Sequence, residues 1–155
     1  MDTFLYVLLA GLLGTMSMSG IMWAISYIGD VNADMVRAIG SFYTKDMKTA
    51  LVPGLITHLI IGILFAFPYA FIISLAPKVL IASIVTGGVL GFVHGYLVSF
   101  GIVALVSDRH PLPEFREAGF AIAAAHVLGH VFYGVTVGWT VGLEGLDFRV
   151  IFEIK

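Results

Sequence analysis

Four histidines lie within long apolar stretches that contain no Asp, Glu, Lys or Arg: His58, His94, His126 and His130. An imidazole in hydrocarbon is unfavourable unless a hydrogen-bond partner or a metal compensates it. Because imidazole ligates haem iron, copper and zinc, these four residues are the candidate cofactor-binding site. Alternatively, neutral imidazoles hydrogen-bond to hydroxyls or carbonyls of neighbouring helices and hold the helices together.

The spacing of the histidines sorts them into two depths. Counted at about 1.5 Å per residue from the loop charges, His58 matches His126, and His94 matches His130. Two such residues on facing helices would suit axial ligation of a b-type haem, and internal symmetry alternatively pairs His58 with His130. Met18 falls at a similar depth, so His94, His130 and Met18 form an alternative copper or zinc ligand set. Binding of no cofactor is the remaining alternative.

The charge distribution predicts the elements that position these residues. Hydrophobic residues make up 59% of the 155-residue chain and charged residues only 12%, which is unlike a soluble domain. The charged residues divide the chain into four long uncharged segments, and each is longer than the roughly 20 residues that cross a bilayer as a helix. Because lipid offers no hydrogen-bond partners, each segment must form its backbone hydrogen bonds within itself, as a helix does. We therefore expect an all-α, polytopic membrane protein, with residues 1–155 forming one four-helix bundle domain. The expected spans are 3–29, 49–77, 79–107 and 118–143.

Three segments outside the spans have recognisable patterns. Residues 32–44 place apolar side chains at helical spacing, which predicts a short amphipathic helix at the membrane interface. The tail 144–155 alternates apolar and polar residues like a strand, and an isolated strand needs a partner such as another subunit. His110 lies in a proline-rich loop and is expected to be solvated.

Small residues recur every four positions in several spans, as at Gly87, Gly91 and Gly95, and such spacing predicts close helix packing. The motif His58-x-x-x-Gly62 in the second span is matched by His130-x-x-x-Gly134 in the fourth. This match suggests a duplicated two-helix unit.

Composition argues against several classes of function. The chain has no cysteine, which removes thiolate metal sites and thiol nucleophiles. No span contains the carboxylates that a di-iron centre or an intramembrane proton relay needs. Phosphate-binding loops and the His-Glu-x-x-His motif are also missing, so we expect no intrinsic catalytic activity. A net charge of −2 argues against nucleic-acid binding.

Several short motifs together resemble an uncharacterised family of small prokaryotic four-helix membrane proteins. The motifs are Gly11-x-x-Gly14, His58-x-x-x-Gly62, Gly91-x-x-His94-Gly95 and Gly129-His130-x-x-Tyr133-Gly134. The resemblance implies the four-span fold in a prokaryotic cytoplasmic membrane and implies no activity. An even number of spans puts both termini on one side, and a slight excess of Lys and Arg in the two larger loops places the termini outside.

Two classes of function follow from these observations. In the first, the chain is an accessory subunit of a larger respiratory or oxidase-type complex, where its histidines bind haem or a metal for electron transfer. In the second, it is a structural or assembly subunit, alone or as a homo-oligomer, whose histidines hold helices together. A small transporter or channel fits less well, because the spans carry no charge to bind or gate an ion.

Overall fold

The computed structural model describes residues 3–29 and 31–144 of this chain. Within these ranges, helices and short loops form the whole structure, and no strand is present. The elements are α1 Thr3–Ile28, α2 Met35–Thr44, α3 Leu51–Ser74, α4 Leu80–Arg109, the 3₁₀ helix η1 Pro113–Phe115 and α5 Phe120–Glu144. Of the predicted strand-like tail, Glu144 ends α5 and the rest lies outside the described residues.

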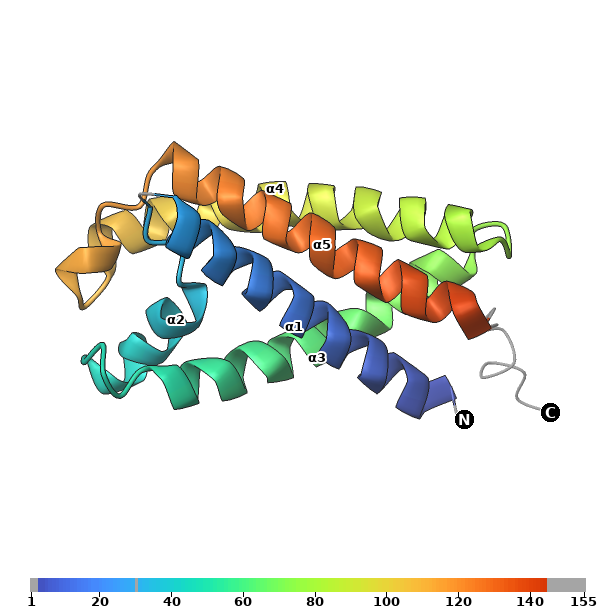
Figure 1. The fold of residues 1–155 in the computed structure, drawn as a ribbon, viewed down its shortest axis with the longest axis horizontal. Coiled ribbons are helices and arrows are strands. Elements are labelled where there is room, and N and C mark those ends of the chain that lie inside the picture. The colour runs from blue at the N-terminus through green and yellow to red at the C-terminus, as the bar shows by residue number, and fades with distance from the viewer. Residues whose placement is uncertain (1–2, 30, 145–155) are drawn as a thin grey trace.

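Four of these helices, α1, α3, α4 and α5, are long and apolar enough to cross a membrane. Large apolar side chains such as Leu64, Leu97 and Leu143 are exposed on their outer faces, where lipid would solvate them. The predicted all-α, four-span architecture is thus confirmed. The first turn of α1 and the last turn of α5 lie at the same end of the bundle as the turn between α3 and α4 (Figure 1).

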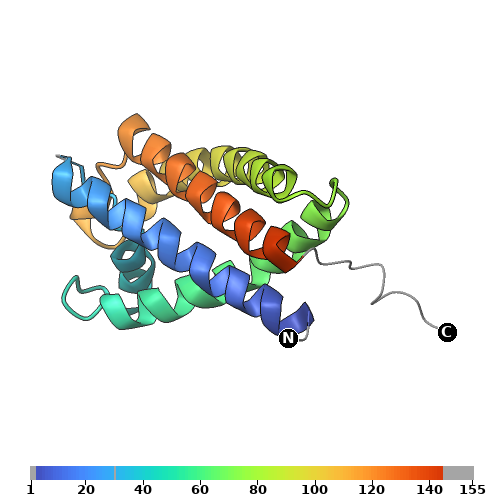
Figure 2. The same ribbon diagram turned by 45° about the vertical axis from the view of Figure 1, so that its right-hand side comes forward.

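The closest helix pair is α4 with α5, which run side by side along most of their length (Figures 1 and 2). A Cβ added to Gly87 would overlap the backbone carbonyl of Gly134, and one added to Gly134 would overlap that of Gly87. Gly91 lies in the same way against the backbone of His130. The close packing predicted from glycine spacing is therefore confirmed, since side chains at these positions would force the backbones apart.

Helix α1 packs against both α3 and α5. Gly62 of α3 accommodates Thr15 of α1, and Gly14 of α1 accommodates Tyr133 of α5. Each His-x-x-x-Gly motif thus places its glycine against the preceding long helix, Gly62 against α1 and Gly134 against α4. This arrangement agrees with a repeated two-helix unit, although the duplication itself stays a prediction.

Helix α2 forms in the loop where an amphipathic helix was expected. The Asp34 side chain caps its start by accepting a hydrogen bond from the Arg37 backbone N–H at 3.0 Å. Lys45, in the left-handed conformation with φ 55°, ends it. Gly40 of α2 and Gly54 of α3 let the two backbones touch. The helix is therefore docked on α3, and its location at a membrane surface stays a prediction.

The prediction of a solvated His110 is wrong, because its side chain is 0% exposed. Its Nε2–H donates to the carbonyl of Ala38 at 3.0 Å, and its Nδ1 accepts from the backbone N–H of Leu112 at 3.1 Å. The ring also packs against Phe42 of α2 and Phe115 of η1. His110 thus ties the α4–α5 loop to α2. Sequence could not reveal this, because its partners lie about 70 residues away along the chain.

Candidate functional site

A cavity of about 320 Å³ lies inside the bundle, and residues of α1, α3, α4 and α5 line it. Helices α3 and α4 meet at the turn 75–79 and diverge toward the other end, where α2 lies between them (Figures 1 and 2). Residues of α2 and Phe115 of η1 line the cavity at that end. The cavity therefore occupies the space that the divergence of α3 from α4 leaves within the bundle.

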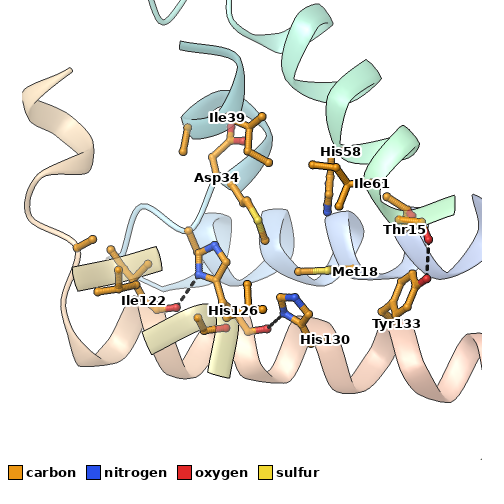
Figure 3. Close-up of a pocket in the computed structure, with 18 of the residues that line it drawn as sticks. Thr15, Met18, Asp34, Ile39, His58, Ile61, Ile122, His126, His130 and Tyr133 are labelled. Atoms are coloured by element: carbon orange, nitrogen blue, oxygen red, sulfur yellow. Dashed lines mark hydrogen bonds between the residues drawn. The ribbon is translucent and has the colours of Figure 1, made fainter. Parts of the chain in front are cut away.

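All five predicted ligand residues line this one cavity: His58, His94, His126, His130 and Met18. Figure 3 shows His126 and His130 projecting from α5 into it, with His58 and Met18 entering from other helices. His94 and His130, which the sequence places at a similar depth, lie next to each other, with their rings in edge contact and the centroids 4.9 Å apart. The structure thus brings together residues that lie up to 112 positions apart in the chain.

The two histidines of α5 bond to their own helix. Nδ1 of His126 lies 2.7 Å from the carbonyl oxygen of Ile122, and Nδ1 of His130 lies 2.8 Å from that of His126. Because a carbonyl oxygen only accepts, Nδ1 carries the hydrogen in both rings. In the neutral imidazole, Nε2 is then an unprotonated acceptor. Within the described part of the chain, neither Nε2 has a hydrogen-bond partner.

The other two histidines bond to other helices. Nδ1 of His58 on α3 lies 3.2 Å from the hydroxyl of Ser19 on α1. Nδ1 of His94 on α4 lies 3.1 Å from the hydroxyl of Tyr69 on α3. A hydroxyl either donates or accepts, so these two rings are free to adopt either tautomer. His58 and His94 therefore make the interhelical bonds that one sequence-based hypothesis assigned to all four histidines, whereas His126 and His130 do not.

Aromatic residues surround this histidine cluster. Phe65 of α3 stacks on the His94 ring with centroids 4.5 Å apart. Tyr133 of α5 donates its hydroxyl hydrogen to the carbonyl of Gly62 at 2.6 Å, and its ring meets Tyr69 edge to face at 5.2 Å. Sequence alone gave no signal for Tyr69 or for Ser19 as histidine partners, because such pairing depends on which helices become neighbours.

Two polar features complete the cavity wall. Ser99 of α4 is 2% exposed, and its hydroxyl has no hydrogen-bond partner in the described residues. Asp34 is the single charged residue among those described as lining the cavity. Its carboxylate is engaged by the Arg37 guanidinium at 2.5 Å and by the indole N–H of Trp23 at 3.2 Å. The wall therefore offers neutral hydrogen-bonding groups and no unpaired charge.

The geometry permits a test of the expected haem. Two imidazoles that bind one metal ion from opposite sides point their nitrogens at it from about 2 Å each. The rings of His94 and His130 instead meet edge to face at an interplanar angle of 76°. Their helices are also in contact, since a Cβ added to Gly95 would lie 2.7 Å from Cβ of His130. This pair does not fit a haem between its rings, and haem binding stays a prediction.

The expected copper or zinc site is not assembled either. Among the described residues, no group of three or more His, Cys, Asp or Glu side chains is arranged to hold a metal ion. The predicted set of His94, His130 and Met18 has two histidines and one thioether, and therefore only two side chains of those four types. Metal binding by this set therefore also stays a prediction.

The chain matches no protein-family model, no curated protein and no solved structure. The resemblance to small prokaryotic four-helix membrane proteins consequently remains an expectation.

Proposed function

We propose that this chain is an integral membrane protein that binds a small, uncharged, mostly apolar molecule in the cavity between its spans. One observation carries the proposal: four imidazoles line a single apolar cavity, and two of them present an Nε2 that no described residue uses. A cavity of about 320 Å³ lies at the lower end of the range for small-molecule sites, which is roughly 300–1,000 Å³. A few polar groups in an otherwise apolar wall are typical of such sites.

The position of the cavity supports a ligand that reaches it through the bilayer. Ile61 and Phe65 of α3 line the cavity and are 42% and 41% exposed. Exposure of this size in two lining residues supports an opening of the cavity toward lipid beside α4. An apolar molecule dissolved in lipid would enter there without crossing the charged loops at the ends of the helices.

A second candidate function, a purely structural subunit, is favoured by the bonds of His58 to Ser19 and of His94 to Tyr69. Under that candidate, all four histidines stabilise the bundle equally. The hydrogen bonds that His126 and His130 make to their own helix favour ligand binding instead, because these bonds do not join two helices. Membership of a respiratory or oxidase-type complex is compatible with either candidate, and it stays a prediction from sequence.

The deciding experiment examines protein taken from its native membrane into lipid nanodiscs. Native mass spectrometry should find one apolar molecule other than a phospholipid per chain, and its occupancy should fall in the His126→Leu variant. The Leu128→Ala variant should retain the molecule, because Leu128 is exposed on the outer face of the same helix. Parallel absorption spectra and elemental analysis detect haem, copper or zinc.

The outcomes separate the candidates. An empty cavity in protein from native membranes contradicts the proposal and supports the structural subunit. Haem bands, or copper or zinc in stoichiometric amount, also overturn it and restore the cofactor hypothesis. Retention of the molecule by His126→Leu would show that the histidine is not part of the binding site.

A further inference from the structure

We infer that the cavity selects molecules that donate hydrogen bonds, namely aromatic alcohols of the phenol and hydroquinone class. This inference rests on the proposed function and adds the chemistry of the ligand. It depends on the hydrogen-bonding capacity of the cavity wall and on the size and character of the space.

The free hydrogen-bonding nitrogens of His126 and His130 in the cavity are acceptors. Because Nδ1–H of His126 and of His130 each donate to a backbone carbonyl, each Nε2 is left with a lone pair and no hydrogen. The two residues are one turn apart on α5, so the two acceptors project from one face of that helix. A ligand that only accepts hydrogen bonds, such as a ketone, a quinone or an ether, would leave both lone pairs unsatisfied. A hydroxyl group satisfies one of them directly.

The described residues that line the cavity carry no unpaired charge. The carboxylate of Asp34 is already neutralised by Arg37, so a cationic ligand would find no free counter-ion among the described lining residues. An anionic ligand would face the two acceptor lone pairs and no cation. An uncharged hydroxyl is therefore the donor that suits this wall.

The cavity has the size and the lining that suit an aromatic ring. An apolar cavity of about 150 Å³ holds one benzene molecule, so the cavity here, at about 320 Å³, has room for a substituted aromatic ring. Aromatic rings are part of its wall, as Phe65, Phe115 and Tyr133 all line it. Stacked or edge-to-face contacts with such rings favour an aromatic ligand over an aliphatic one.

The test compares two probes, one with a hydroxyl donor and one with a methyl group in place of the hydroxyl hydrogen. 4-Fluoro-3,5-dimethylphenol and its methyl ether, 4-fluoro-3,5-dimethylanisole, have the same ring, and fluorine NMR follows both in nanodiscs with and without protein. The phenol should bind roughly 10-fold more tightly, as expected for about one net hydrogen bond in a buried site. In the His126→Leu variant this preference should fall to near 1, whereas Leu128→Ala should keep it.

The possible results separate this inference from the proposed function. Equal binding of both probes, or tighter binding of the ether, overturns donor selection and leaves the apolar binding site standing. Binding of neither probe contradicts the proposed function itself. Loss of binding of both probes in His126→Leu would indicate a damaged cavity, and His130→Leu then provides the second comparison, because it removes the other free Nε2 acceptor and should also lower the preference for the phenol.

A phenol with the same ring and an added prenyl chain tests whether the ligand is a membrane-resident hydroquinone or a small phenol that enters from water. Tighter binding than the unprenylated probe would assign the occupant to hydroquinones that reside in the membrane. Weaker binding would assign it to small phenols that partition into the bilayer from water. Either result agrees with selection of a hydroxyl donor.

Discussion

His130 donates its Nδ1–H to the backbone carbonyl of His126, one turn earlier on α5, at a distance of 2.8 Å. This bond fixes the tautomer of His130 without help from any other helix. His126 repeats the arrangement with Ile122 at 2.7 Å. Two successive turns of α5 therefore present acceptor nitrogens to the same cavity, and this regularity distinguishes them from histidines that only connect helices.

Replacing Ser99 by alanine should stabilise the protein. Its hydroxyl is buried without a partner in the described residues, and leaving such a group unsatisfied costs about 1–3 kcal/mol. We expect Ser99→Ala to raise the free energy of unfolding by roughly 1 kcal/mol, measured by denaturation in detergent without added ligand. Ser41→Ala is the matched control, since the Ser41 hydroxyl donates to the carbonyl of Arg37 at 2.8 Å. A lower stability of Ser99→Ala would show that its hydroxyl has a partner.

The contact between α4 and α5 should be sensitive to a single methyl group. Gly87→Ala would push a Cβ into the carbonyl of Gly134, and overpacking of this kind typically costs about 1–3 kcal/mol. Gly101→Ala on the same helix is the control, because a Cβ there meets no atom within 4 Å. The control should be neutral or stabilising by up to about 1 kcal/mol. Equal effects of the two variants on the unfolding midpoint would contradict the packing of this helix pair.

Truncating His110 should loosen helix α2. His110→Ala removes a buried ring that donates to the Ala38 carbonyl and accepts from the Leu112 backbone N–H, so the Leu112 N–H loses its partner and the Ala38 carbonyl keeps the bond from the Ser41 hydroxyl. A loss of this kind costs roughly 1–3 kcal/mol, and hydrogen exchange of the α2 amides should speed up accordingly. Arg109→Ala serves as the control, because Arg109 is exposed at the end of α4. Unchanged exchange in His110→Ala would mean that the loop does not hold α2 in place.

The absence of native cysteine makes the topology measurable with single introduced cysteines. Tyr43 in α2 is 64% exposed and Val79 before α4 is 56% exposed, and α2 lies at the opposite end of the bundle from the turn between α3 and α4 (Figure 1). An impermeant maleimide should label Val79→Cys in intact cells, and should label Tyr43→Cys only after the membrane is permeabilised. The reverse pattern would contradict the predicted orientation. Labelling of both sites in intact cells would contradict the four-span arrangement.

The amino-acid sequence by itself determined the class of architecture. Each span is defined by its length and by its lack of charge, because a bilayer forces any such segment to satisfy its own backbone as a helix. The glycine spacing that predicted close packing of α4 against α5 is likewise a local property of each helix. The bonds of His126 and His130 to the preceding turn also depend on residues only four positions away.

Only the tertiary structure decided which side chains meet. Ser19 bonds to His58, Tyr69 bonds to His94, and His110 is buried under α2. None of these contacts follows from spacing along the chain, because each depends on how neighbouring helices cross and rotate relative to one another. The cavity has the same origin, since it exists where α3 diverges from α4 while α1 and α5 remain packed. Apolar segments of the same length would form four helices in many arrangements, and side-chain packing between them selects one.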